Sequence, residues 1–439
     1  MGKPIVAVVG RPNVGKSTLF NKLVGRRVSI VDDTPGVTRD RIYADCEWRG
    51  REVLLIDTGG IEPYSDDEIL TQMRRQASLA IDMADVIIMV VDLRTGVTAA
   101  DEDVAAMLRK SSKPIVLCVN KCDSLGNPPA EFYEFYNLGL GEPVQVSSVH
   151  GHGTGDLLDE VYNYLPADDA EAEDSDAVKV AVIGRPNAGK SSLINYIAGE
   201  NRLIVSDIAG TTRDSVDMRV DNDYGSFIFT DTAGLRRKSK VDDKIEKYSI
   251  VRTKAAVERC DVCVIMIDAT VGFTEQDSKV AGLALDAGKG CIIAVNKWDA
   301  VEKDGKTMDS YRKKLMNDFS FMSFAVMVFI SAKTGERVNR LFELIKYVAD
   351  QNSMRISTGM LNDLLIDATS RVQPPSDKGR RLKIYYMTQS SVCPPTFVLF
   401  CNRADLFHFS YKRYIENRIR ETYGFEGAPI RMIIRERGD

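Results

Sequence analysis

Short apolar runs alternate with longer stretches of mixed polarity through residue 352. These runs are rich in β-branched residues and predict strands. The predicted strands are residues 5–9, 53–57, 86–92, 115–120 and 144–147, and then 180–183, 227–231, 262–268, 291–296 and 326–331. Strands that alternate with helices predict an α/β fold with a parallel sheet covered on both faces. Ligands bind such sheets at the carboxyl ends of the strands, where polar motifs stand in this sequence.

The sequence contains one set of motifs twice. GRPNVGKS, from Gly10 to Ser17, recurs 174 residues later as GRPNAGKS, and TRD and DTGG recur at the same spacing as TRD and DTAG. NKCD at 120–123 recurs as NKWD 176 residues later, and the serine pair at 147–148 has a counterpart 184 residues later. Five motifs in one order, with a spacing that changes only through later insertions, predict a duplicated domain.

The repeat and the apolar pattern divide the chain into three domains. We expect a first domain at residues 1–166, a linker at 167–177, a second domain at 178–352 and a third at 353–439. The linker, ADDAEAEDSDA, has six carboxylates and no aromatic or β-branched residue. Such a segment cannot bury a core and is expected to be solvated. An acidic binding segment is the alternative interpretation.

GxxxxGKS after a predicted strand and before a predicted helix is the pattern of a phosphate-binding loop. Its glycines let backbone N–H groups turn toward phosphate oxygens, and the helix N-terminus adds positive potential. Lys16 and Lys190 would reach the β- and γ-phosphates, while the hydroxyls of Ser17 and Ser191 would bind Mg²⁺. A structural glycine turn is the alternative for one such pattern alone. The predicted contacts of the two loops are Gly10, Asn13, Gly15, Lys16, Ser17 and Thr18, and Gly184, Asn187, Gly189, Lys190, Ser191 and Ser192.

Two further motifs offer groups for Mg²⁺ and for the γ-phosphate. Asp57 and Asp231 each end an apolar run, where a carboxylate can hold the Mg²⁺ shell. The glycine of DxxG can bring its backbone N–H to the γ-phosphate, since no side chain blocks the approach. A threonine in the preceding polar loop, Thr38 or Thr212, can bind Mg²⁺ while the γ-phosphate is present and release it after hydrolysis. The predicted catalytic residues are Lys16, Thr38, Gly60, Lys190, Thr212 and Gly234.

The NKxD motif predicts a preference for guanine. The carboxylate of Asp123 or Asp299 can accept hydrogen bonds from N1–H and N2–H₂ of guanine, whereas adenine would leave it buried and unpaired. Such a penalty can discriminate by a factor of about 10⁴–10⁵, so we expect GTP to be preferred over ATP. The predicted base-site residues are Asn120, Lys121, Asp123, Ser147 and Ser148, and Asn296, Lys297, Asp299, Ser331 and Ala332.

The residue after DxxG is apolar in both repeats, Ile61 and Leu235. Ras-type enzymes have a glutamine there that orients the attacking water, so GTP binding without hydrolysis is one interpretation. The other rests on Asn13 and Asn187, whose amide oxygens could help hold K⁺ beside the phosphates. A cation there would neutralise developing charge as an arginine finger does. Asparagine as a loop-capping residue is the alternative.

With GRPNVGKS, TPGVTRD, DTGG and NKCD followed by GRPNAGKS, AGTTRD, DTAG and NKWD, the chain resembles the Der (EngA) family. These are bacterial tandem GTPases of ribosome assembly. The resemblance covers essentially the whole chain and implies two Ras-like phosphate-loop GTPase domains followed by a C-terminal α+β KH-like domain. It also implies GTP and GDP, Mg²⁺ and K⁺ as ligands, K⁺-stimulated hydrolysis without the glutamine, and the large ribosomal subunit or its precursor as partner. The nucleotide state would set the arrangement of the domains and their docking.

Residues 353–439 form the basic part of an acidic chain. They carry 14 lysines and arginines against 9 aspartates and glutamates, a net charge of +5, whereas the whole chain has −5. This distribution is typical of RNA contact. The apolar pattern predicts a helix at 354–370, strands at 382–389 and 396–402, a helix at 410–423 and a strand at 430–435. The expected RNA contacts, with a solvated face as the alternative, are Lys378, Arg380, Arg381, Lys412 and Arg413.

KH domains that bind nucleic acid clamp its backbone with a GxxG loop between two helices. The only GxxG of the third segment, Gly424 to Gly427, stands between a predicted helix and the last predicted strand and contains an acidic residue. We interpret it as a helix C-cap and turn.

The remaining composition is that of an ordinary globular protein, with 44% hydrophobic and 28% charged residues. No apolar run reaches the ~18 residues of a membrane span, so we expect no membrane contact. Of the eight cysteines, Cys260 and Cys263 have the spacing of a ligand pair but stand in an apparent buried strand, so we expect no metal or redox site there. Free thiols are typical of a reducing compartment, which predicts a cytoplasmic protein. We expect a monomer.

Three other functions remain open from the sequence. A phosphate-loop kinase or ATPase would lack NKxD. An RNA-binding assembly scaffold would use GTP as a latch that it does not hydrolyse. A related GTPase of tRNA modification or septum formation is disfavoured by the tandem repeats and the basic third segment.

Overall fold

The computed structural model of the chain describes residues 3–25, 43–60, 69–111, 113–123, 128–165, 176–199, 204–207, 217–230, 246–302, 304, 306–377 and 380–436. The chain forms two compact units. The first comprises Met1–Ser175, Asp207–Asp217 and Arg237–Arg259, and the second comprises Asp176–Ser206, Met218–Arg236 and Cys260–Asp439. Most of the predicted acidic linker lies outside the described residues.

The first unit contains a six-stranded sheet in the order β2-β3-β1-β4-β5-β6. The strands are β1 (Ile5–Val9), β2 (Tyr43–Trp48), β3 (Arg51–Asp57), β4 (Val86–Asp92), β5 (Ile115–Asn120) and β6 (Val144–Gln145). Neighbouring strands from β3 to β6 are parallel. The five predicted strands are therefore parallel, as predicted, while β2, which was not predicted, is antiparallel to β3.

The antiparallel edge arises from a tight hairpin that the apolar pattern does not reveal. Arg49 and Gly50 have φ angles of 50° and 79°, the positive values that a two-residue hairpin turn requires. Cys46 is the one buried residue of β2. The strand therefore lacks the apolar run that marks its neighbours in the sequence.

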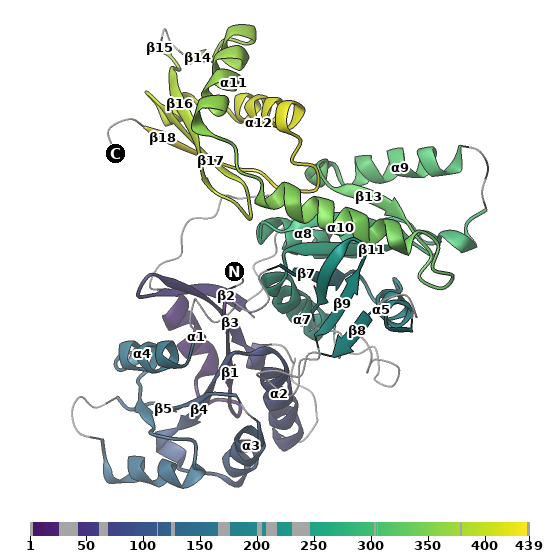
Figure 1. Cartoon of the computed structure of the whole chain (residues 1–439). Coiled ribbons are helices and arrows are strands. Elements are labelled where there is room, and N and C mark those ends of the chain that lie inside the picture. Colours follow the sequence, from purple (N-terminus) through teal and green to yellow (C-terminus); the bar gives the residue numbers. More distant parts are fainter. Residues whose placement is uncertain are drawn as a thin grey trace. The chain divides into compact units, whose positions relative to one another are not determined.

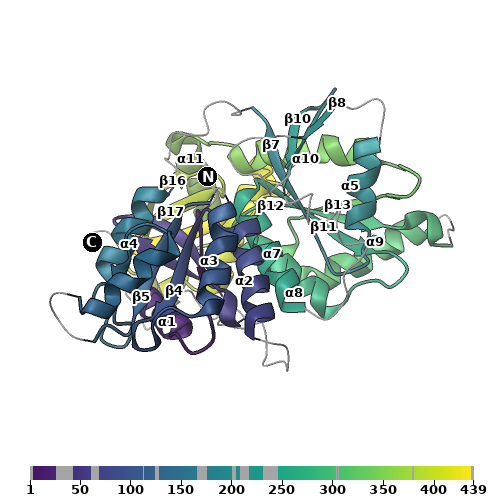
Figure 2. The same cartoon turned by 90° about the horizontal axis from the view of Figure 1, so that it is seen from below.

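Helices cover both faces of this sheet (Figure 1, Figure 2). On one face α1 (Lys16–Val24) and α4 (Thr154–Tyr164) pack against Val6 and Val8 of the central strand. On the other face α2 (Ile69–Met83) and α3 (Ala99–Lys110) pack against Ile5, Ala7 and Val9. Because side chains alternate along a strand, a strand covered on both faces is a continuous apolar run. The first unit also contains α7 (Glu246–Arg259).

The second unit contains a seven-stranded sheet in the order β13-β12-β11-β7-β10-β9-β8. The strands are β7 (Val178–Ile183), β8 (Ile204–Asp207), β9 (Met218–Asn222), β10 (Gly225–Phe229), β11 (Val262–Asp268), β12 (Gly290–Asn296) and β13 (Val326–Phe329). β9 is antiparallel to β10, and the pairs from β10 to β13 are parallel. β7 lies between β10 and β11 as β1 lies between β3 and β4. Both repeats thus place GxxxxGKS after the same strand of the sheet.

Within the described residues of the second unit, the helices of this repeat are α5 (Lys190–Gly199), α8 (Glu275–Asp286), α9 (Thr307–Asp318) and α10 (Val338–Ser353). α5 and α10 pack in one apolar cluster with β7 and β10. Cys263 lies in β11 and Cys260 lies two residues before that strand; both are buried. The prediction that this segment forms a buried strand is confirmed from Val262 onward.

The C-terminal segment is an α+β layer pair in the same unit (Figure 1). It contains α11 (Thr358–Arg371), β14 (Ser376–Asp377), β15 (Arg380–Arg381), β16 (Ile384–Ser391), β17 (Thr396–Cys401), α12 (Phe409–Tyr423) and β18 (Arg431–Glu436). β17 is antiparallel to β16 and parallel to β18. The predicted element order is confirmed, although the first helix begins at Thr358 because Ser357 caps it through the backbone N–H of Met360. The short β14–β15 hairpin was not predicted.

The GxxG segment ends α12, as predicted, and also joins the C-terminal segment to the second repeat. Gly424 is the C-cap residue of α12. Gly427 donates its N–H to the carbonyl oxygen of Phe324 at 2.7 Å and accepts from the N–H of Cys291 at 2.7 Å. Its φ is 76°, and a Cβ there would lie 2.4 Å from a methyl group of Val348. The position therefore needs glycine.

None of the described helices is long and apolar enough to cross a membrane.

Candidate nucleotide-binding sites

The predicted phosphate loop of the first repeat follows β1 and opens α1. Gly10 and Gly15 have φ angles of 156° and 96°. A Cβ at Gly10 would lie 2.3 Å from the carbonyl oxygen of Val90, and one at Gly15 would lie 2.3 Å from Nδ2 of Asn120. The loop can approach its neighbours this closely only because both residues lack a side chain.

The lysine of each loop is held inside the loop. Nζ of Lys16 donates to the carbonyl oxygens of Gly10 at 2.7 Å and Arg11 at 2.8 Å. Nζ of Lys190 donates to the corresponding two carbonyl oxygens, both at 2.7 Å. Burial lowers the pKa of Lys16 to about 8, although the nearby Asp57 opposes the shift. The two loops thus have the same internal hydrogen bonds.

Ser17 and Asp57 bring two oxygens together beside the first loop. Oγ of Ser17 donates to Oδ2 of Asp57 at 2.8 Å, and the N–H of Gly59 donates to Oδ1 at 2.9 Å. The Asp57 side chain is buried. A buried carboxylate next to a hydroxyl is an all-oxygen set of the kind that Mg²⁺ binds, so the residues fit this ion. Gly60 ends the short turn η1 (Thr58–Gly60) directly after them.

Several predicted site residues lie outside the described residues. They are Thr38 and Ile61 of the first repeat, and Thr212, Asp231, Gly234 and Leu235 of the second.

Asn120 and Asn296 connect the predicted base site to the phosphate loop. Nδ2 of Asn120 donates to the Val14 carbonyl at 2.7 Å, while its Oδ1 accepts from the N–H and Oγ of Ser148 at 3.0 and 2.7 Å. Nδ2 of Asn296 donates to the Ala188 carbonyl at 2.9 Å, and its Oδ1 accepts from the N–H of Ala332 at 2.9 Å. The structure therefore brings three predicted segments together in each repeat, through equivalent bonds.

The lysine of NKxD pairs with an aspartate that the sequence reasoning missed. Nζ of Lys121 donates to Oδ2 of Asp92 at 2.7 Å and to the Asn13 carbonyl at 2.8 Å. Nζ of Lys297 donates to Oδ2 of Asp268 at 2.6 Å. The signal was present in the sequence, since each of these aspartates ends an apolar run next to the strand that carries NKxD. Although burial opposes it, hydrogen bonds from Lys297 and Thr270 keep the pKa of Asp268 below its usual range.

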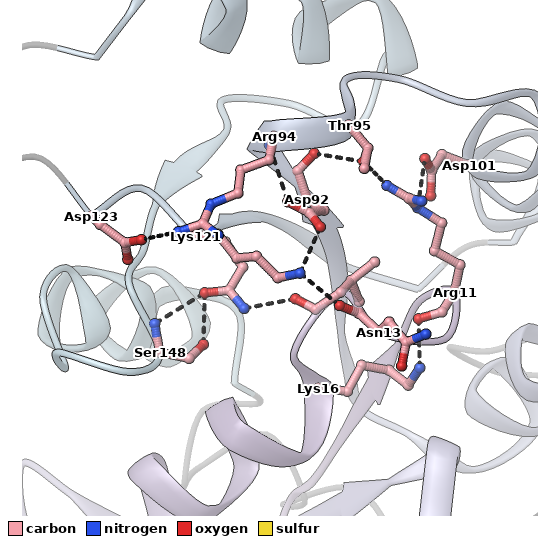
Figure 3. Close-up of polar contacts among 12 residues, drawn as sticks. Arg11, Asn13, Lys16, Asp92, Arg94, Thr95, Asp101, Lys121, Asp123 and Ser148 are labelled. Atoms are coloured by element: carbon pink, nitrogen blue, oxygen red, sulfur yellow. Dashed lines mark hydrogen bonds and ion pairs between the residues drawn. The ribbon is translucent and has the colours of Figure 1, made fainter.

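Both carboxylate oxygens of Asp123 accept hydrogen bonds from side chains, and Figure 3 shows the one from Arg94. Oγ of Ser147 donates to Oδ1 at 2.7 Å, and Nη2 of Arg94 donates to Oδ2 at 2.6 Å. The bond from Ser147 is the main cause that keeps the pKa of Asp123 below its usual range. Burial opposes this shift, and the pairing with Arg94 supports it. Arg94 was not among the predicted site residues.

Asn13 and Asn187 have φ angles of 65° and 63°. Asparagine tolerates this left-handed conformation better than most residues. The backbone therefore gives a local reason for asparagine at both positions, in addition to the predicted contact with K⁺.

A second pair of residues that was not predicted links each phosphate loop to a helix further along the chain, α3 or α8. Nε of Arg11 lies 3.4 Å from a carboxylate oxygen of Asp101, and Nε of Arg185 lies 3.7 Å from one of Asp277. Each aspartate is buried and completes a capping box at the start of α3 or α8. Figure 3 also shows Arg11 donating to the hydroxyl of Thr95. These contacts fix the loops against the helices that follow β4 and β11.

Comparison with known proteins matches each part of this architecture. A family model described as 50S ribosome-binding GTPase matches residues 5–121 and 179–297, and one for the C-terminal KH-domain-like part of EngA bacterial GTPase enzymes matches residues 355–435. A model of the elongation factor Tu GTP-binding domain matches residues 246–351. GTPase Der of Acetivibrio thermocellus is 62% identical over 437 residues, which cover 100% of this chain and 99% of that protein. The chain belongs to the Der family.

Other Der proteins match over the same length. GTPase Der of Ruminiclostridium cellulolyticum is 62% identical and that of Caldicellulosiruptor saccharolyticus 59% identical, each over 100% of this chain and 99% of the relative. Among solved structures, an Era variant from Aquifex aeolicus bound to GDP·AlF4⁻ is 20% identical with a TM-score of 0.31, covering 60% of this chain and 93% of its own. The Der relatives and the family models confirm the resemblance drawn from the motifs. They also confirm the predicted fold of two GTPase domains followed by a KH-like domain.

Proposed function

We propose that both GTPase domains of this Der family member bind guanine nucleotide with Mg²⁺ and hydrolyse GTP, and that the nucleotide state controls docking on the large ribosomal subunit or its precursor. The observation that carries this proposal is the duplication of the loop geometry. Lys16 and Lys190 make the same two bonds inside their loops, and Asn120 and Asn296 make the same link from loop to base site. A second domain that had lost nucleotide binding would not be expected to keep both the lysine bonds and the asparagine bond.

In the phosphate half of each site, the chain's own groups orient and neutralise the nucleotide. Lys16 is buried beside the loop and exchanges its carbonyl partners for β- and γ-phosphate oxygens. The backbone N–H groups at the start of α1 point toward the same oxygens and carry the positive end of the helix dipole. Lys190 and α5 have these roles in the second domain. Gly60 and Gly234 would offer a backbone N–H to the γ-phosphate.

Ser17 and Asp57 would hold Mg²⁺ in the first domain, with Ser191 and Asp231 in the second. Mg²⁺ neutralises the charge that develops on the phosphate oxygens. Thr38 and Thr212 would complete this set only while the γ-phosphate is present.

In the base half of each site, Asp123 and Asp299 would accept the N1–H and N2–H₂ donors of guanine. Asn120 positions the backbone N–H of Ser148, and Asn296 positions that of Ala332. Because these two N–H groups are bonded to the asparagines, we propose that backbone N–H groups near Ser148 and Ala332 in the same segments would donate to guanine O6. The stems of Lys121 and Lys297 would lie along the base plane.

K⁺ would occupy the place of the missing glutamine and arginine finger. The apolar Ile61 and Leu235 cannot orient a water, and Asn13 and Asn187 are the loop residues with an amide oxygen to offer. A fixed cation there would be worth about 10³–10⁵ in rate if it acts as an arginine finger does.

The proposed partner follows from the family and from charge. The matching family is described as 50S ribosome-binding GTPase. In the C-terminal domain Arg380, Arg381 and Arg413 are exposed, and Lys412 is partly exposed; Lys378 lies outside the described residues. We propose that these cations contact rRNA phosphates. We further propose that the chain acts as a cytoplasmic monomer, with domains at 1–166, 178–352 and 353–439.

Steady-state GTP turnover by the full chain, measured with Lys16→Ala and Lys190→Ala separately, tests the enzymatic part. Each variant should lose the contribution of its own domain and leave the other. Unchanged turnover in both variants, or no turnover by the parent chain in K⁺ with Mg²⁺, would contradict the proposal and favour a GTP latch. Cosedimentation with ribosomal subunits in GTP, in GDP and without nucleotide tests the docking.

A further inference from the structure

The guanine-reading carboxylate of the first domain is engaged by an arginine from a neighbouring loop. Nη2 of Arg94 lies 2.6 Å from Oδ2 of Asp123, with the two side chains 66% and 35% exposed. Arg94 stands in the short turn η2 (Leu93–Thr95), directly after β4. The guanidinium thus lies at the carboxylate edge to which the proposed function brings the two donors of guanine (Figure 3).

The second domain has the same backbone but a different side chain at this place. In the strand register, Asp92 of β4 lies opposite Asn120 of β5, and Asp268 of β11 lies opposite Asn296 of β12. This register aligns Arg94 with Thr270. Thr270 turns back on its own strand, where its N–H and Oγ1 donate to Oδ1 of Asp268 at 2.9 and 2.6 Å.

The backbone turn is common to both domains, so the contrast lies in the side chain. In the first domain the N–H of Arg94 donates to Oδ1 of Asp92 at 3.0 Å, as that of Thr270 donates to Asp268. The guanidinium is then free to extend toward Asp123. A threonine hydroxyl already bonded to Asp268 is too short to do the equivalent.

We propose that Arg94 competes with the guanine base for Asp123 and so sets a lower affinity for guanine nucleotide in the first domain than the same site would have with threonine. This inference rests on the proposed function, because it assumes that Asp123 reads guanine. Guanine presents two donors in one plane and needs both carboxylate oxygens. The guanidinium places its own donor and its positive charge at Oδ2, so the base must share this oxygen with Arg94 or displace it.

Competition, rather than preorganisation of Asp123, follows from the other contacts of this carboxylate. Ser147 already orients it through Oδ1, so Arg94 is not needed to hold the side chain in place. Arg94 adds positive charge where the base must bring its own N–H donors. The exposure of the pair keeps the effect small, since exposed ion pairs change an equilibrium by about 1.5- to 5-fold.

The test measures dissociation constants and release rates of GDP carrying a fluorescent label on the ribose, with the full-length chain. An Asp299→Asn background restricts tight guanine binding to the first domain, because an amide cannot accept both guanine donors. In this background Arg94→Thr should bind labelled GDP about 1.5- to 5-fold more tightly, with most of the change in the release rate.

A matched control removes the same charge from the same domain at a distance from the base site. Arg74 pairs with Asp103 at 2.6 Å, and both side chains are on the surface. Arg74→Thr should leave GDP affinity unchanged or weaken it slightly through lost attraction for the phosphates. The reciprocal change, Thr270→Arg in an Asp123→Asn background, should weaken GDP binding by the second domain.

Ionic strength gives a second signature. Screening at about 1 M salt shortens the Debye length to about 3 Å. The dissociation constants of labelled GDP for the chain with Arg94 and for Arg94→Thr should therefore become nearly equal. Choline chloride at fixed K⁺ raises ionic strength without changing the proposed cation site.

The experiment distinguishes a failure of the competition by Arg94 from a failure of guanine recognition by Asp123. Equal or weaker GDP binding by Arg94→Thr would overturn the competition, while a preserved preference for GDP over ADP would leave the proposed function intact. Unchanged GDP binding after Asp123→Asn in the Asp299→Asn background would instead contradict guanine reading itself, and the role of Arg94 with it.

Discussion

Nδ2 of Asn120 donates to the carbonyl oxygen of Val14 at 2.7 Å, and this bond ties the guanine-reading segment to the phosphate loop. Asn296 and Ala188 are joined in the same way in the second domain. Phosphate and base contacts are therefore parts of one hydrogen-bonded unit in each domain. Shifting one half of the site displaces the other.

This coupling predicts the effect of removing the amide. Asn120→Ala leaves the buried Val14 carbonyl and the Ser148 N–H without this partner, and each unsatisfied buried group costs about 1–3 kcal/mol. We expect a lower free energy of unfolding and loss of nucleotide binding by the first domain. Urea denaturation and labelled-GDP titration check both. Asn296→Ala should do the same to the second domain only, and a variant with native stability and native binding would contradict the coupling.

Lys16 predicts a pH dependence of stability in the absence of nucleotide. Burial lowers its pKa in the folded chain to about 8 from an ordinary 10.5, so between these values the unfolded chain binds more protons. The contribution of Lys16 to the free energy of unfolding therefore rises with pH, by up to about 1.4 kcal/mol per pH unit. The free energy of unfolding of the parent chain should increase relative to that of Lys16→Met as the pH increases from 8 to 10. Urea denaturation of both at several pH values would refute this if their difference stayed constant.

The amide of Asn13 predicts a difference between K⁺ and Na⁺. Asn13→Gly removes the amide but keeps a residue that accepts the φ of 65°, so the loop conformation should persist. In a Lys190→Ala background, we expect loss of K⁺ stimulation of GTP hydrolysis with little change in GDP affinity. Turnover in matched K⁺ and Na⁺ buffers measures this. Retained K⁺ stimulation would assign Asn13 to the backbone conformation alone.

Gly427 predicts how the KH-like domain is held on the second GTPase domain. In Gly427→Ala the new methyl group would meet Val348, and the left-handed backbone would add about 1–2 kcal/mol. We expect a lower melting temperature and faster amide exchange at Cys291, which donates to Gly427. Gly359→Ala is a suitable control, because a Cβ there meets no atom within 4 Å. Equal exchange rates in the two variants would show that the turn does not hold the domains together.

The sequence predicted the core strands and the residues that meet at their ends, because buried parallel strands are apolar runs and the motifs follow them directly. It missed β2, where Cys46 is the one buried residue, and β9, where buried and half-buried residues alternate. Both strands pair through hairpins and have no apolar run. Arg94 and Asp92 were missed for another reason. Asp92 ends an apolar run but belongs to no known motif, and Arg94 follows that strand without one. The register of β4 beside β5 brings Asp92 to NKxD.

The role of the GxxG segment was predicted only in part from the sequence. The sequence predicted a helix end correctly, since glycine commonly follows a helix. It could not predict that the backbone of Gly427 bonds to Phe324 and Cys291, because neither partner is near it in the sequence. Backbone groups are the same in every residue type, so contacts made through them between domains produce no recognisable pattern in the sequence.

The most direct test of the account is an equilibrium titration of the nucleotide-free full-length chain with GDP and, separately, with ADP. Because each domain carries its own loop, base-reading aspartate and connecting asparagine, we predict two GDP sites per chain and at least 10³-fold weaker binding of ADP at both. Loss of one GDP site in Asp123→Asn and of the other in Asp299→Asn should follow. A single GDP site at saturation, or equal affinity for the two nucleotides, would contradict the account.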